Sequence, residues 1–182
     1  MIEPPIQPME HWLEIDQSGR VIRALRTNRL VEERHPRLIE VDEETYRMIV
    51  RDKIPLRRVG DSWLPDIPVA RDAALDSLQR LADRAANAPL PRSEVERFQQ
   101  SMRWAEAQTF SAHGTAGAFL ERAAEGRTVA EAAEESLGEI RAFNAHLDAV
   151  NAVLASVRQK IIAASTHAEI EQIMASIEWP HA

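Results

Sequence analysis

The chain has 182 residues and a formal net charge of -7, with 45% hydrophobic and 28% charged residues. This composition is ordinary for a folded protein and allows one or two small domains with a real core. Cysteine is absent, which excludes disulfides, thiolate metal sites and cysteine nucleophiles.

Membrane insertion and nucleic-acid binding are both disfavoured. The opening residues MIEPPIQPMEHW lack the basic start and apolar core of a signal peptide. No apolar run approaches the roughly 18 residues that a membrane-spanning helix needs. Residues 66–182 hold eleven basic and seventeen acidic side chains, and an acidic helical half repels phosphate backbones. We therefore expect partners that are proteins.

Residues 1–10 carry three prolines and should form an extended arm without backbone pairing of its own. The arm is either a loose tail or a segment held against a neighbouring subunit or another protein. The prolines are Pro4, Pro5 and Pro8.

Residues 11–65 read as a small ββ-β-α-ββ unit. Apolar residues flank the turn sequence Asp16-Gln17-Ser18-Gly19, a good hairpin signal. A short strand at 37–41 leads to Asp42, which should cap a helix whose first turn is acidic and whose end is basic. A second hairpin turns at Gly60-Asp61 and stops at Pro65.

Four arginines follow the first turn at intervals of three residues. This spacing does not keep side chains on one face of a strand. A solvated surface is therefore favoured over a phosphate site. The residues are Arg20, Arg23, Arg26 and Arg29.

Residues 66–182 read as a helical domain, with helices expected near 69–86, 93–110, 118–125, 128–165 and 166–179. Three of them open with a Ser or Thr followed three residues later by Glu, the sequence signature of a capping box. The helix near 93–110 should bury one face at heptad spacing, made of Val95, Phe98, Met102 and Ala105. The capping pairs are Ser93 with Glu96, Thr128 with Glu131, and Thr166 with Glu169.

The helix near 128–165 is apolar at every seam position of four consecutive heptads, which is typical of coiled-coil packing. The seam weakens at Ser136, and Gly138 should lie on the outer face, where a bend is expected. Packing within the chain and self-association stay equally open, and valine at two d positions favours a trimer or tetramer over a parallel dimer. The helix-packing or oligomer seam is Ile140, Phe143, Leu147, Val150, Leu154, Val157, Ile161 and Ala164.

The sequence signals no catalytic, cofactor-binding or metal-binding residue. None of the six histidines shares a helix face with another at the i, i+4 spacing of a metal pair, and no glycine-rich phosphate loop occurs. Acidic pairs such as Glu43-Glu44 and Glu134-Glu135 are expected on solvated helix faces. The histidines are His11, His35, His113, His146, His167 and His181.

Three tryptophans are candidates for contact with a partner. Trp12 and Trp63 fall in the two hairpins. We favour the interpretation that they cover the core of the β unit, and contact with a partner protein is the alternative. Trp104 lies one residue off the apolar stripe of its helix, so it should contact either the β unit or another chain.

The order of these pieces resembles small proteins encoded near the tail-fibre genes of tailed bacteriophages, including tail-fibre assembly proteins. The resemblance rests on HWLEIDQSGRVI, RLIEVDEETYRMIV and VGDSWLP, and on the helical stretches TAGAFLERAAEGRTVAEAAEESL and VRQKIIAASTHAEIEQIMASIEW. It implies a non-enzymatic role in the tail, baseplate or fibre attachment, or a chaperone of fibre folding. It brings no catalytic residues and does not extend to residues 66–110.

We therefore expect an α+β protein with a hairpin-rich N-terminal unit and a helical bundle. The favoured function is a structural component of a phage tail or tail-fibre apparatus, made in the host cytoplasm and located in the virion. Its partners would be other tail or fibre proteins, within a homo-oligomer (a trimer is favoured) or a larger assembly. The alternatives are a fibre-assembly chaperone and, from another class, a small enzyme or regulatory protein. No cofactor is expected.

Overall fold

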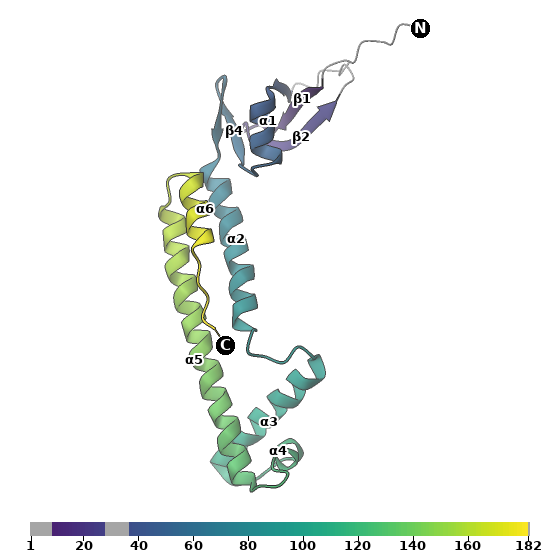
Figure 1. The fold of residues 1–182 in the computed structure, drawn as a ribbon, viewed down its shortest axis with the longest axis vertical. Coiled ribbons are helices and arrows are strands. Elements are labelled where there is room, and N and C mark those ends of the chain that lie inside the picture. The colour runs from purple at the N-terminus through teal and green to yellow at the C-terminus, as the bar shows by residue number, and fades with distance from the viewer. Residues whose placement is uncertain (1–8, 28–36, 182) are drawn as a thin grey trace, which may run out of the picture. The chain divides into compact units, whose positions relative to one another are not determined.

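The computed structural model describes residues 9–27 and 37–181, and it confirms the α+β class. Two small antiparallel sheets, with a short helix between them, come first along the chain, and the longer helical region follows (Figure 1). Most of the expected arm at 1–10, with its three prolines, lies outside the described residues, as do Arg29 and His35.

The first sheet contains three antiparallel strands in the order β2-β1-β3, so β1 is paired on both edges. β1 carries the largest apolar side chains of the sheet, and Leu13 and Trp12 are both buried. Asp16 organises the β1–β2 turn, since its Oδ1 accepts the backbone N–H groups of Ser18 and Arg20 at 2.8 and 3.0 Å. The strands are β1 (Glu10–Ile15), β2 (Val21–Thr27) and β3 (Leu38–Val41).

Helix α1 (Glu43–Val50) begins at the capping residue that the sequence predicts. The Asp42 carboxylate accepts the backbone N–H of Thr45 at 2.7 Å. This hydrogen bond lowers the pKa of Asp42 below its usual range. Ser93, Thr128 and Thr166 cap their helices in the same way.

A second, two-stranded sheet follows, made of β4 (Leu56–Val59) and β5 (Ser62–Pro65). The β1–β2 turn lies against β4, because the Gly19 carbonyl accepts the Arg58 backbone N–H at 2.8 Å. The neighbouring residue ties this turn to the next helix: Arg20 Nε lies 2.9 Å from Asp66 Oδ2. Asp66 is only 1% exposed in its side chain. The two hairpins and the start of the helical region thus share one polar junction.

Five helices follow, close to the expected ranges. α4 is short, and α5 runs as one continuous helix through Gly138, where the sequence predicts a bend. They are α2 (Ile67–Ala86), α3 (Glu94–His113), α4 (Ala118–Ala123), α5 (Val129–Ala163) and α6 (His167–Ala175).

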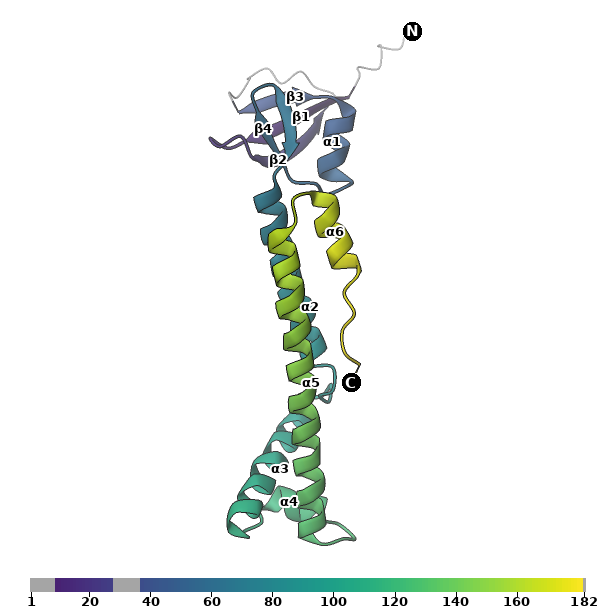
Figure 2. The same cartoon turned by 90° about the vertical axis from the view of Figure 1, so that its left-hand side faces the viewer.

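The chain forms two compact units that do not follow the expected boundary after residue 65. The first comprises Met1–Asp76 with Gln159–Ser176, and the second Ser77–Arg158 with Ile177–Ala182. Within the second unit, the end of α2 lies beside the middle of α5 (Figures 1 and 2). Each unit holds one of the polar contacts that join these helices. Arg71 Nε donates to the Ala164 carbonyl at 3.1 Å in the first unit, and His146 Nε2 donates to the Ala85 carbonyl at 2.8 Å in the second.

Gly138 is a position where alanine should stabilise the protein. A Cβ built there meets only the flexible end of Arg141, at 3.8 Å, so the site has room. Glycine inside a helix costs about 1 kcal/mol relative to alanine, so Gly138→Ala should raise the free energy of unfolding in urea by about 1 kcal/mol. The control is Ala145→Gly at an exposed position of α5, which should lower it by a similar amount. A lower free energy of unfolding in Gly138→Ala would contradict the conclusion that the site has room for a methyl group.

Candidate functional site

The heptad seam of α5 faces the interior of the chain. Val150, Val157, Ile161 and Ala164 are buried, and the other four seam residues are partly buried. The buried face of α5 also extends back to Ser136, which is 1% exposed. The Ser136 hydroxyl donates a hydrogen bond to the Ala132 carbonyl at 2.8 Å. The helix face therefore stays packed at Ser136, and the weaker seam that the sequence predicts there stays a prediction.

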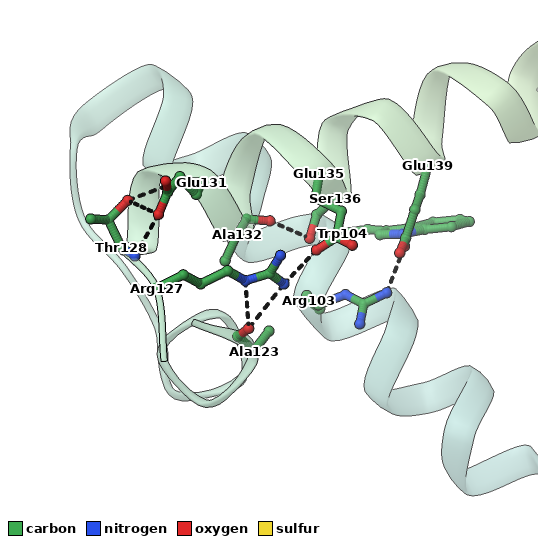
Figure 3. Close-up of polar contacts among 10 residues, drawn as sticks. All are labelled: Arg103, Trp104, Ala123, Arg127, Thr128, Glu131, Ala132, Glu135, Ser136 and Glu139. Carbon is green, nitrogen blue, oxygen red and sulfur yellow. Dashed lines mark hydrogen bonds and ion pairs between the residues drawn. The ribbon is translucent and has the colours of Figure 1, made fainter. Parts of the chain in front are cut away.

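A polar junction joins α3 to α5 inside the second unit (Figure 3). Glu139 Oε2 accepts the indole N–H of Trp104 at 2.7 Å and Arg103 Nη2 at 2.5 Å. The Trp104 ring also lies against Phe143 of the seam, with centroids 5.5 Å apart. The Trp104 side chain therefore anchors α3 to α5, and its one polar group, the indole N–H, is used within the chain.

The start of α5 carries a second polar cluster in the same view (Figure 3). The Glu131 carboxylate accepts both the backbone N–H and the hydroxyl of Thr128, each at 2.8 Å. Arg127 donates to the Ala123 carbonyl at the end of α4, at 3.1 and 3.2 Å, and pairs with Glu135. These contacts fix the α4–α5 connection.

The capping box of α5 should make the protein sensitive to acid. The backbone hydrogen bond from Thr128 lowers the pKa of Glu131 below 4.5, with smaller contributions from the Thr128 hydroxyl and Arg127. A lowered folded-state pKa contributes stability above about pH 4.5, and that contribution is lost as the pH falls through the folded value. We expect Glu131→Gln to lose less stability than the natural chain between pH 6 and pH 3, measured by thermal unfolding. Equal losses would contradict the capping role.

A cavity of about 430 Å³ lies beside the Trp104–Glu139 junction. Its walls are mainly apolar, and its polar residues include Gln100, Glu139, His146 and His181. The residues around it are Pro89, Leu90, Gln100, Trp104, Glu139, Ala142, Phe143, His146, Ala149, Pro180 and His181. All belong to the second unit.

The other two candidate tryptophans take different places in the first unit. Trp12 is 9% exposed, and its indole N–H donates to Glu10 at 3.2 Å, so little of the ring is free for a partner. Trp63 is partly buried on β5, opposite Arg58.

The outer face of the second hairpin is exposed and partly apolar. The register places Val59 opposite Ser62 and Arg57 opposite Leu64 on one face of this hairpin. Val59 and Leu64 are 48% and 50% exposed. No sequence pattern predicted this exposed face.

The apolar stripe of α3 is turned away from the core, contrary to its predicted burial. Val95 is 65% and Phe98 57% exposed, Ala105 is exposed and Met102 only partly buried. The opposite face packs inward, with Ala107 fully buried. The prediction failed because Trp104, Arg103 and Ala107 form the contacts to α5 and α4. We call Val95, Phe98, Met102 and Ala105 the α3 stripe.

Two further histidines contact other side chains. His11 stacks on Tyr46, with ring centroids 4.5 Å apart, and His167 lies 3.7 Å from Glu171. Across residues 9–27 and 37–181, no group of three or more His, Cys, Asp or Glu side chains is placed to hold a metal ion. Within these same ranges, no helix combines the length and the apolar character needed to cross a membrane.

Comparison of the chain with protein-family models, with curated proteins and with solved structures finds no match.

Proposed function

We propose that this chain is a non-enzymatic structural component of a bacteriophage tail or tail-fibre/baseplate apparatus, and that it acts through protein–protein contacts. The observation that carries the proposal is the exposure of large apolar side chains on well-formed elements. Phe98 and Val95 project from α3, and Val59 and Leu64 from the β4–β5 hairpin. Clustered apolar side chains on a folded surface mark sites that another protein covers.

The choice of a phage tail rests on the sequence resemblance in the two hairpins and the helical ends. The hairpin with VGDSWLP forms β4 and β5 and carries one of the two apolar faces. The resemblance and the exposed surface thus meet in the same element. A structural part would keep these surfaces permanently covered within the assembled tail.

Mass spectrometry of purified virions tests this proposal. Virions of a phage that encodes the chain, washed in high salt to remove loosely bound protein, should retain it in a fixed ratio to a major tail protein. Phage carrying Leu64→Ser should incorporate less of the chain. The control is Ser62→Ala on the same hairpin face, which should leave the incorporated amount normal. Absence from virions, with a continued requirement for fibre attachment, would contradict the proposal and favour a chaperone.

A further inference from the structure

We infer that the α3 stripe is a self-association surface, and that its occupant is the α3 stripe of a second copy of this chain, packed antiparallel across a two-fold axis. The seam of α5 does not serve this purpose, because its residues are buried or partly buried within the chain. The two-fold dimer therefore replaces the trimer that the α5 seam suggests.

The exposure of the stripe is the first reason. Val95 and Phe98 lie on adjacent turns and are 65% and 57% exposed, which leaves a bulky apolar ridge open to water. Phe119 of α4 lies beside Phe98, with ring centroids 6.0 Å apart, and widens the patch. Single exposed apolar residues are common on monomers, but a contiguous ridge of this kind marks an interface.

The spacing of the stripe is the second reason. Its four residues are separated by three, four and three positions, so the pattern reads the same in both directions about residue 100. Antiparallel pairing then sets Phe98 against Met102 of the second copy, and Val95 against Ala105, with the same two contacts repeated on the other side of the axis. Each of these two contacts joins a larger side chain to a smaller or more flexible one: Val95 meets Ala105, and Phe98 meets Met102, whose sulfur packs well on an aromatic ring.

The charges along the stripe also fit a second copy. Gln99 and Ser101 border the centre of the stripe. In an antiparallel pair, Gln99 would face Gln99 of the second copy and Ser101 would face Ser101 of the second copy, and both residues are uncharged. Glu94 would face Gln108 of the second copy rather than another carboxylate. The border therefore brings no like charges together in a self-pair. It also lacks the row of charges that would select a strongly acidic or basic partner of another kind.

The small size of this contact predicts a reversible dimer. The stripe covers residues 95–105, roughly 15 Å of helix at about 1.5 Å per residue. We expect a contact of this length to bury less than the roughly 1,200 Å² typical of a stable interface. We therefore expect dissociation on dilution.

Sedimentation of the full chain over a concentration series tests the inference. The natural chain should move from the mass of one chain toward that of two. Val95→Ser combined with Phe98→Ser should stay at one chain, with unchanged helix content because both side chains are exposed. The control Ile22→Ser changes a residue that is 60% exposed in β2 and should behave as the natural chain does. A natural chain that stays monomeric, or a double variant that still dimerises, would overturn the inference.

Disulfide trapping tests the antiparallel arrangement, and it is clean because the chain has no cysteine. Ser101→Cys, next to the two-fold axis, should form a disulfide-linked dimer under mild oxidation. Val95→Cys should not, because it faces position 105, whereas Val95→Cys combined with Ala105→Cys should. Ready cross-linking by Val95→Cys alone would indicate parallel helices and overturn the arrangement. These tests use the isolated chain, so their outcome is separate from the virion experiment.

Discussion

Replacing Val150 with aspartate is expected to lower the free energy of unfolding by about 3–5 kcal/mol. Val150 is 2% exposed in the middle of the α5 seam, so the new carboxylate would lose its water without gaining a partner. The change also removes apolar burial, and the leucine and alanine side chains of α2 in the same unit, Leu78 and Ala82, are buried as well. Urea unfolding followed by circular dichroism at 222 nm measures the loss.

Ala152→Asp is the matched control for this prediction. It adds the same charge two residues along the same helix, at an exposed position. The expected cost is limited to the lower helix propensity of aspartate, about 0.7 kcal/mol or less. Similar losses in the two variants would mean that the seam does not face a packed interior.

From the sequence alone, the expected cost of an aspartate is the same at Val150, Leu147 and Leu154, because all three occupy seam positions of the heptad pattern. In the structure Val150 is buried, whereas Leu147 and Leu154 are only partly buried. A carboxylate at either leucine would keep some contact with water, so its cost should be smaller. Heptad position predicts which face of a helix is apolar, but the depth of burial depends on what packs against each turn.

The helix starts were predictable because the signals are local. Asp42, Ser93 and Thr166 each cap the helix that follows them, and the side chain in each case reaches a backbone N–H only three residues away. Such contacts form between neighbours in sequence and need no knowledge of the tertiary fold.

The orientation of α3 was not predictable, since two competing faces share this helix. The more regular one, with Val95 and Phe98, is exposed. The face that packs carries Ala107 and the polar pair Arg103 and Trp104, whose partner Glu139 is some 35 residues further on. A hydrogen bond to a residue that distant leaves no periodic trace, so the sequence favoured the wrong face.

Long-range contacts to backbone carbonyls were invisible for the same reason. Arg71 donates to Ala164, which lies 93 residues away, and His146 donates to Ala85, which lies 61 residues away. Each donor meets a carbonyl near the end of a helix, where backbone acceptors lack intrahelical partners. Arginine and histidine at surface-like positions gave no sign of this role.

Gly19→Ala is the second substitution for which we expect a large effect, a loss of about 3 kcal/mol in the free energy of unfolding. Gly19 has a φ of +82°, and a Cβ there would lie 2.7 Å from the backbone carbonyl oxygen of Arg58. Because that atom belongs to the backbone, β4 would have to move. The hydrogen bond from Arg58 to the Gly19 carbonyl at 2.8 Å would then be lost, and the adjoining Arg20–Asp66 pair would be disturbed.

Gly60→Ala separates the close approach from the backbone conformation. Gly60 also has a positive φ, +62°, but a Cβ there meets nothing within 4 Å. Its replacement should cost only the left-handed strain of a non-glycine residue, about 1–2 kcal/mol. Thermal unfolding of both variants should therefore place Gly19→Ala clearly below Gly60→Ala. Equal midpoints would show that the β1–β2 turn does not rest on β4, because only that contact distinguishes the two glycines.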